Sequence, residues 1–286
     1  MGLLDNLKKF GIKDIDTEHM YEKKESAPAK KTQIETKAAE IPTEESFLYK
    51  KKYACPICDG AIDSLTCKSN SLRLLKMDTD LRPQYLGIDP IKYEPVVCPR
   101  CGYGVMSRYF ADVTSRQRKE FIDAIGSTFD GHVADEFVVS YEQALFKFEL
   151  VLASCIVKGT KASEKAYVCL KGGWLCRGYV EAIESGEASG DEAKIEELKG
   201  KETEFLEAAY DGFLQARQTE MFPIAGMDEG TLDYVLAALA FNKGNLEDCG
   251  KMLSKILVSP SSSNKLKERA RTLKDELAKK KKADEA

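Results

Sequence analysis

The sequence predicts an α+β protein in which a small, β-rich, four-cysteine unit precedes an all-α helical array. Two observations carry this prediction. The tetrapeptide Cys-Pro-x-Cys occurs twice, at Cys55–Cys58 and Cys98–Cys101, in a stretch rich in Pro, Gly, Tyr and Val. Beyond residue 112, apolar residues recur at helical spacing, as Leu145, Phe148 and Leu152 do.

The chain of 286 residues divides into three predicted parts. Residues 1–46 are a short amphipathic segment and a linker, residues 47–112 a metal-binding unit, and residues 113–286 a helical domain.

The content of 43% hydrophobic and 31% charged residues is typical of a soluble globular protein. The net charge of −4 argues against a protein that binds polyanions through bulk charge. No apolar run reaches the roughly 18–20 residues that span a bilayer. Nine cysteines without a recognisable export signal predict a reducing cytoplasm.

Residues 1–12 have the pattern of a short amphipathic helix, with Leu3, Leu4 and Leu7 on one face. Either this segment is a frayed tail, which its length favours, or it makes a weak contact with a membrane or a partner. Residues 16–46 are polar, charged and poor in aromatic side chains, so burial cannot offset the entropy of ordering them. They are therefore predicted to be a disordered linker.

The paired motifs predict a metal site formed by Cys55, Cys58, Cys98 and Cys101. In each motif Pro presets φ and the following residues allow a tight turn, so both thiolates point at one ion. Four thiolates complete a tetrahedral site with no open position, which is a structural arrangement. The spacing thus predicts a zinc-ribbon-like unit with an insertion between the motifs. Zinc is favoured, although four thiolates also suit a rubredoxin-like iron, and a redox dithiol is the alternative. The other five cysteines are interpreted as structural or core residues.

The insertion carries a distinctive series of polar and aromatic residues. The series is Asp78, Asp80, Pro83, Tyr85, Asp89-Pro90 and Tyr93, followed by Cys98, Cys101, Gly102 and Tyr103. This pattern resembles the bacterial family labelled domain of unknown function 2225, in which Asn is expected in place of Asp89 and Ala in place of Gly104. The resemblance implies two cysteine motifs followed by TPR-like helices, and it implies no activity.

Six residues of the insertion form a candidate polar site. They are Asp78, Asp80, Arg82, Tyr85, Asp89 and Tyr93. Paired carboxylates can perform acid–base chemistry or hold Mg²⁺, so an enzyme or nucleotide-handling module centred on Asp78, Asp80 and Tyr85 is one hypothesis. No nucleophile, phosphate loop or catalytic histidine accompanies them, since His19 and His132 lie in a predicted linker and loop. We therefore favour the second hypothesis, that these residues staple the turns of the insertion to the ribbon.

Basic and acidic residues balance across the predicted metal-binding unit. Between Cys55 and Asp112 there are seven of each sign. A surface that binds phosphates needs an excess of basic residues. The sequence therefore predicts no nucleic-acid partner.

Residues 234–260 follow the TPR repeat pattern closely. Gly244-Asn245 is the predicted turn between two helices, Cys249 takes the small-residue position, and Pro260 ends the repeat. A second match lies around Phe213. A generic helical bundle is the alternative to a TPR-like array.

A TPR-like array binds other proteins in a groove lined by the first helix of each pair. The candidate groove helices span residues 166–183 and 231–242. The candidate partner-binding residues are Tyr167, Trp174, Arg177, Tyr234 and Asn242. Arg177 and Asn242 are favoured, because their polar ends need water or a partner. The sequence thus predicts a non-catalytic cytoplasmic scaffold or adaptor. The alternatives are the enzyme described above and a thiol- or metal-based redox sensor.

Overall fold

The computed structural model of the protein describes residues 43–130 and 138–284. Residues 41–286 form one compact unit. The predicted amphipathic segment at 1–12, most of the predicted linker and His132 lie outside the described residues.

Within the described residues, the first regular element begins slightly before the predicted boundary at residue 47. A 3₁₀ helix, η2 (Glu44–Phe47), contains the last residues of the predicted linker and ends at the buried side chain of Phe47. Glu44 forms an ion pair with Lys92 (2.6 Å) and accepts a hydrogen bond from Tyr93 Oη (2.8 Å). These contacts explain why the end of the predicted linker is folded.

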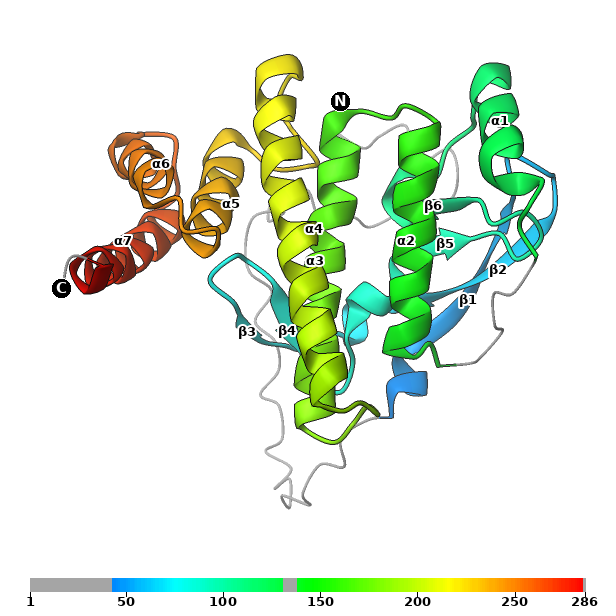
Figure 1. Cartoon of the computed structure of the whole chain (residues 1–286), viewed down its shortest axis with the longest axis horizontal. Helices are drawn as coiled ribbons and strands as arrows, with labels where there is room; N and C mark the ends of the chain where they lie inside the picture. Colours follow the sequence, from blue (N-terminus) through cyan, green and yellow to red (C-terminus); the bar gives the residue numbers. More distant parts are fainter. Residues whose placement is uncertain (1–42, 131–137, 285–286) are drawn as a thin grey trace, which may run out of the picture. The chain divides into compact units, whose positions relative to one another are not determined.

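Three two-stranded antiparallel sheets make up the first part of the described chain (Figure 1). The strand pairs are β1 (Leu48–Ala54) with β2 (Ala61–Cys67), β3 (Leu74–Met77) with β4 (Pro83–Tyr85), and β5 (Pro95–Val97) with β6 (Gly104–Met106). Short 3₁₀ helices lie between and after them, namely η3 (Ser69–Ser71), η4 (Pro90–Tyr93) and η5 (Ser107–Tyr109). The β1–β2 and β5–β6 hairpins each turn through one Cys-Pro-x-Cys motif, whereas β3–β4 belongs to the insertion.

The two faces of the β5–β6 hairpin are buried in different places. Val96 and Val105 are cross-strand partners and pack with the cysteines of the two motifs. Val97 and Met106 belong instead to the main core that the helices form. Because side chains alternate along a strand, this short hairpin joins the cysteine unit to the helices.

The helices follow in the order expected for the second part of the chain. They are α1 (Ser115–Phe121), continued by a π-helical turn at Ile122–Gly126, then α2 (Tyr141–Val157), α3 (Ala162–Glu184), α4 (Glu192–Thr219), α5 (Glu229–Asn242), α6 (Leu246–Val258) and α7 (Asn264–Asp284). A predicted capping box opens α2: Gln143 N donates to Ser140 Oγ (3.2 Å), and Ser140 N donates to Gln143 Oε1 (3.1 Å).

The helices form two groups (Figure 1). In the first, α3 packs between α2 and α4, and α2 also covers β5 and β6. In the second, α5, α6 and α7 pack on one another, and α5 contacts α4. Helices α3 and α4 have 23 and 28 residues, whereas α5 and α6 have 14 and 13. The second predicted repeat, around Phe213, therefore lies within one long helix, while α5 and α6 meet at the predicted Gly244-Asn245 turn.

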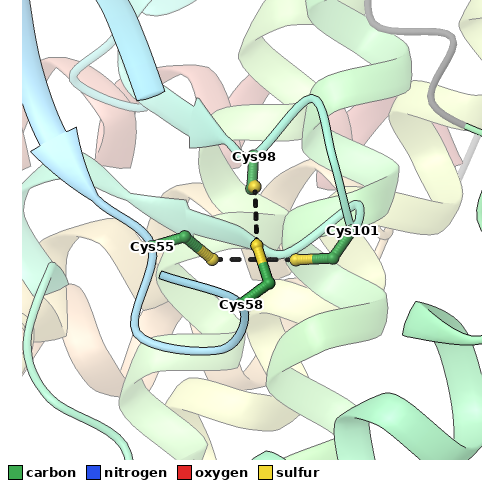
Figure 2. Close-up of side chains that lie close together, drawn as sticks. All are labelled: Cys55, Cys58, Cys98 and Cys101. Atoms are coloured by element: carbon green, nitrogen blue, oxygen red, sulfur yellow. Dashed lines mark hydrogen bonds between the residues drawn. The ribbon is translucent and has the colours of Figure 1, made fainter. Parts of the chain in front are cut away.

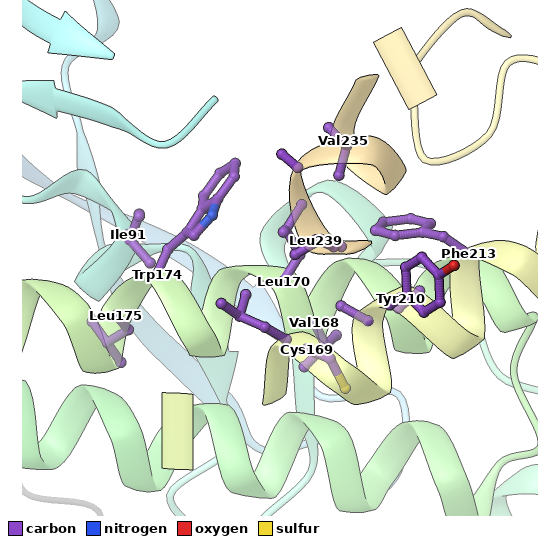
Figure 3. Packing of buried hydrophobic residues seen from close by; sticks show 14 of the residues in the cluster. Ile91, Val168, Cys169, Leu170, Trp174, Leu175, Tyr210, Phe213, Val235 and Leu239 are labelled. Atoms are coloured by element: carbon purple, nitrogen blue, oxygen red, sulfur yellow. The ribbon is translucent and has the colours of Figure 1, made fainter. Parts of the chain in front are cut away.

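The main hydrophobic core runs between these helices and includes Trp174 (Figure 3). Strand β6 reaches this core at Gly104, where it touches α2 directly. A Cβ atom on Gly104 would lie 2.8 Å from the backbone nitrogen of Val151, and Gly104 N donates to Ser154 Oγ (3.0 Å). This close approach accounts for glycine at a position where the resemblance led us to expect alanine.

Candidate metal centre and cleft

The two Cys-Pro-x-Cys motifs adopt the same turn. In both, the N–H of the first cysteine donates to the carbonyl five residues later (2.9 and 2.8 Å), and the N–H four residues later donates to the carbonyl of that cysteine (3.0 Å in each). The residue after each second cysteine has positive φ, 57° at Asp59 and 72° at Gly102. Asp and Gly tolerate this conformation. Asp59 therefore takes the place of glycine in the first turn, as the sequence predicts.

Figure 2 shows the four cysteine side chains pointing toward one another. The Sγ atoms of Cys55, Cys58, Cys98 and Cys101 all lie within 4.8 Å of one another. The Cys55–Cys101 and Cys58–Cys98 pairs are each 3.6 Å apart. Thiolates bound at about 2.3 Å around one zinc ion would be about 3.8 Å apart, so the ligand set and its spacing fit a tetrahedral site. Cys58 is half-buried and the other three are buried, and no coordination position is left for water or substrate.

The thiols of Cys98 and Cys101 have pKa values shifted in opposite directions. Hydrogen bonds from Cys101 and Cys55 lower the pKa of Cys98, whereas hydrogen bonds with Cys55 and Cys98 raise the pKa of Cys101. The cluster therefore favours a thiolate at Cys98, and thiolates are the form of cysteine that binds metal. A metal ion that binds here would displace the remaining protons.

The other five cysteines lie outside this cluster. Burial raises the pKa of the Cys67 and Cys155 thiols to about 12, and that of Cys249 to about 11. These groups are therefore neutral thiols near pH 7. Cys155, Cys169, Cys176 and Cys249 are buried in the main core, as the sequence predicts.

A second, smaller apolar cluster encloses the four cysteines and connects them to the first helices. Its members include Ile57, Tyr103 and Phe121, so α1 contributes directly. Lys158, just after α2, donates to Tyr103 Oη (3.1 Å), and Arg118 of α1 donates to Pro56 O (3.0 Å). The metal centre is therefore supported by α1 and α2 as well as by its own hairpins.

The turn of the β3–β4 hairpin is bonded to the helices through Asp80. This carboxylate is only 2% exposed. It accepts two hydrogen bonds from Arg177 of α3 (3.1 and 2.8 Å) and one from Trp174 Nε1 (3.0 Å). Arg177 also donates to Glu202 of α4 (2.8 Å). Burial acts to lower the pKa of Arg177, but these two carboxylates outweigh it and raise the pKa. The network joins the turn to two long helices.

Asp78 belongs to the same network. Arg82, which is 4% exposed, donates to Asp78 (3.2 Å) and to Glu181 of α3 (2.5 Å), and Gln84 donates to Asp78 (3.0 Å). We expected such bonds to staple the insertion to the ribbon. They run mainly to α3 instead, because the complementary arginine and glutamate lie on that helix.

The other residues of the predicted polar site are spread along the junction with the helices. Asp89 accepts a hydrogen bond from Tyr141 Oη of α2 (3.2 Å) and caps η4. Tyr93 donates to Glu44, as described above, and Tyr85 packs at the edge of the main core. The six predicted residues therefore do not surround one common substrate position.

Asp89 allows a prediction about pH. Burial raises its pKa, although hydrogen bonds and nearby cations oppose the shift. A carboxyl group of this kind binds protons more tightly in the folded state. Its contribution to the free energy of unfolding therefore falls as pH rises from the unfolded pKa, about 3.9, through the folded pKa.

We expect Asp89→Asn to reduce the decrease of the free energy of unfolding with pH, measured by urea unfolding between about pH 4 and 8. Asp63→Asn, at an exposed position of β2, is the control. An unchanged slope in Asp89→Asn would contradict the prediction.

A cleft of about 760 Å³ lies between the β3–β4 turn and helices α3, α4, α5 and α7. Asp78 and Asp80 form part of the wall on the hairpin side. Arg177 and Asn242 line it from α3 and from the end of α5. The sequence placed these two pairs in different candidate sites, and the structure brings them into one cleft.

The predicted partner-binding residues differ in their access to this cleft. Trp174 and Tyr234 are 5% and 2% exposed, so they are core residues and do not lie at an accessible surface. Tyr167 is partly buried under the guanidinium group of Arg108 (4.6 Å to the ring centre). The polar end of Arg177 is held by ion pairs rather than by water. Among the five predicted residues, Asn242 is the exposed one.

Sequence reasoning missed every charged residue of the cleft other than Asp78, Asp80 and Arg177; three of those missed are Glu181, Glu202 and Lys280. All three lie on helices where charged residues are frequent, so residue type alone does not single them out. The one usable signal is that Glu181 follows Arg177 by four residues, which places both on one face of a helix.

Together these features define a class of protein: small antiparallel sheets that carry a four-cysteine cluster able to hold a metal ion, followed by a helical array. The chain belongs to DUF2225, a family described as an uncharacterized protein conserved in bacteria, whose model matches residues 48–277. The family resemblance seen in the insertion is thereby confirmed, and the match extends into α7. No curated protein and no solved structure matches the chain. Among the described helices, none has the length and apolar character needed to cross a membrane.

Proposed function

We propose that this protein is a non-catalytic adaptor in which a structural zinc ion holds the β hairpins together and the cleft binds a segment of another protein. The closed set of four thiolates supports a structural role for the metal, because no position remains for a substrate. All nine cysteines are free of disulfides, which supports the reducing cytoplasm that the sequence predicts.

The cleft is the observation that carries this proposal. Its volume of about 760 Å³ lies within the usual range for ligand sites, and its walls mix apolar and charged side chains. One wall is the end of α5, which contributes Leu239, Phe241 and Asn242. Helices α5 and α6 have the short lengths, the tight turn and the following helix that a TPR-like repeat requires. In such repeats the first helix of each pair faces the bound peptide, and α5 is that helix here.

The ion pairs of Asp78 and Asp80 favour the adaptor over the enzyme hypothesis. Each carboxylate is already paired with a guanidinium group, from Arg82 or Arg177. A general base or a magnesium ligand needs a carboxylate that can accept a proton or a cation from its substrate. We infer that these residues position the hairpin wall of the cleft.

Filling the cleft tests the proposal. Charge reversal of Arg177 is unsuitable, because it would leave Asp80 and Glu202 without their partner. Thr203 is better, because it is exposed and lines the cleft from α4. We expect Thr203→Arg to reduce at least tenfold the capture of partners by full-length, zinc-loaded protein. Capture would be measured by quantitative mass spectrometry after photocrosslinking from position Asn242.

Thr219 offers a matched control on the same helix. Like Thr203, it is exposed and donates to the carbonyl four residues earlier (2.9 Å, against 3.0 Å for Thr203), but it does not line the cleft. Thr219→Arg should therefore retain capture, and both variants should keep the wild-type melting temperature. Equal capture by wild type and Thr203→Arg would rule out the cleft as the binding site.

A further inference from the structure

Helix α7 carries a row of cations along one flank. The helix contains nine Lys or Arg and four Asp or Glu residues, although the whole chain has a net charge of −4. The flank consists of Lys267, Arg271, Lys274, Ala278 and Lys281, at successive spacings of four, three, four and three residues. Such spacing places all five on one side of a helix. No ion pair involves these four cations within residues 43–130 and 138–284. We call this row the basic stripe.

Helix α4 carries the opposite charge in the same periodic pattern. Its row consists of Glu197, Gly200, Glu204, Glu207 and Asp211, at spacings of three, four, three and four residues. This row, the acidic stripe, lies opposite the buried residues of α4, such as Leu206 and Phe213. The side chains of Glu197, Glu207 and Asp211 are 48%, 46% and 68% exposed.

The acidic stripe has weak partners within its own copy. Glu207 and Asp211 each lie 3.9 Å from Lys243, at the limit of an ion pair. Glu197 has a closer partner in Lys194 (2.9 Å), three residues earlier on the same exposed helix surface. Exposed pairs of this kind contribute little to stability, so exchanging them for new partners costs little.

The two stripes match when the helices run antiparallel. Read from its C-terminal end, the acidic stripe of α4 has spacings of four, three, four and three residues. These are the spacings of the basic stripe of α7. The facing residues are then Asp211 with Lys267, Glu207 with Arg271, Glu204 with Lys274, Gly200 with Ala278, and Glu197 with Lys281. Four positions oppose an acid to a base, and the fifth opposes the two smallest side chains. A Cβ atom on Gly200 would meet nothing within 4 Å, so this part of the stripe is open. From this match we infer that copies of the chain associate through α4 of one copy and α7 of another.

A second copy fits the basic stripe better than a nucleic acid or a membrane does. Both halves of the complementary pair are on this chain, whereas the net charge of the chain opposes a polyanion. The apolar face of α7, with Leu273 and Leu277, is buried within its own copy, so the stripe has no large apolar side chain to insert into a bilayer. Within one copy α7 packs on α5 and α6 while α4 packs mainly on α3, so neither stripe lies in a helix–helix contact of its own copy, although Glu207 also lines the cleft.

This association is reversible and sensitive to salt. Single exposed ion pairs are weak, and a Debye length of about 8 Å at physiological ionic strength screens them. Sedimentation velocity of the full-length, zinc-loaded protein at up to about 100 μM should therefore show association in about 50 mM NaCl. The same protein should be largely monomeric in about 500 mM NaCl, where the screening length is shorter.

Exchanging the charges of the two stripes tests the inference. The basic-reversed variant is Lys267→Glu with Lys274→Glu, and the acid-reversed variant is Glu204→Lys with Asp211→Lys. Each turns two attractive pairs into repulsive ones, so each alone should associate at least about tenfold more weakly than wild type. An equimolar mixture of the two should associate again, because the reversed stripe of one variant then faces the reversed stripe of the other.

Lys50→Glu with Lys119→Glu is the matched control for the basic-reversed variant, since it makes the same change of net charge at exposed positions outside the stripes. It should associate as wild type does. A wild-type monomer at 100 μM in low salt, wild-type association of either reversed variant, or failure of the mixture to associate would each overturn the inference. If the basic-reversed variant kept its association and lost binding to a labelled oligonucleotide or to anionic vesicles, the basic stripe would be a polyanion site and the inference would be wrong.

Discussion

Cys98→Ser should abolish metal binding and unfold the cysteine unit. Wild-type protein is expected to contain one zinc ion per chain, and the variant less than about a tenth of that, by elemental analysis. Structural zinc sites have apparent binding free energies of about 10–16 kcal/mol, which is comparable to the whole stability of a domain. The loss should reach α1 and α2, because Phe121 and Lys158 pack on the cysteine unit. Hydrogen exchange would show this as lost protection in both cysteine-bearing hairpins, in α1 and at the end of α2.

The control is Cys67→Ser, at a half-buried cysteine that lies in β2 outside the cluster. It should keep a full complement of metal. Wild-type protein that contains neither zinc nor iron after purification without chelators would contradict the metal prediction, and iron in place of zinc would correct the identity of the ion.

The second large effect is expected at Asp80. Asp80→Ala removes the partner of a largely buried guanidinium group and leaves Trp174 Nε1 without an acceptor. Removing one member of a buried ion pair typically costs about 3–5 kcal/mol, and Glu202 should keep the loss at the lower end by retaining its bond to Arg177. Asp80→Asn keeps the shape and one acceptor, so it should cost less, about 1–3 kcal/mol. Urea unfolding monitored by circular dichroism would measure both.

Two comparisons separate this effect from other causes. Asp63→Ala removes an exposed carboxylate from β2 and should change the free energy of unfolding by less than about 0.5 kcal/mol. The metal content of Asp80→Ala should stay at the wild-type level, because the ion pair lies outside the cysteine cluster. Wild-type stability in Asp80→Ala would show that the carboxylate is not structural and would revive the enzyme hypothesis.

The four-cysteine cluster could be predicted from sequence because its geometry is set locally. Each motif encodes its own turn, and Asp59 and Gly102 supply the conformation that the turn needs. The cap at Ser140 and the turn at Gly244 were predictable for the same reason, since they depend on neighbours within a few residues. The family resemblance covered the insertion because its polar residues occur as a compact series.

The hairpin wall of the cleft could not be predicted, because it depends on contacts between distant segments. Asp80 and Arg177 are 97 residues apart, and nothing in their local sequence identifies them as partners. The ion pairs of Arg177 could not be foreseen for the same reason: a polar end on an apolar helix indicates either a surface or a buried partner, and only folding decides between them. The second repeat match, around Phe213 of α4, has a similar origin. Apolar residues spaced by four and then three positions occur on all buried helix faces, so this spacing alone does not identify a repeat.

The distance between Asp80 and Arg177 has a consequence during protein synthesis. The chain is made from its N-terminus at about 5–20 residues per second, so both cysteine motifs and the hairpin leave the ribosome well before α3. For the 97 residues between them, this delay lasts about 5–20 s. During that time Asp78 and Asp80 have no contact with Arg177, whereas Asp78 can already accept hydrogen bonds from Arg82 and Gln84 of its own hairpin. When α3 emerges, its arginine therefore meets a segment of the chain that already contains both of its hairpin partners.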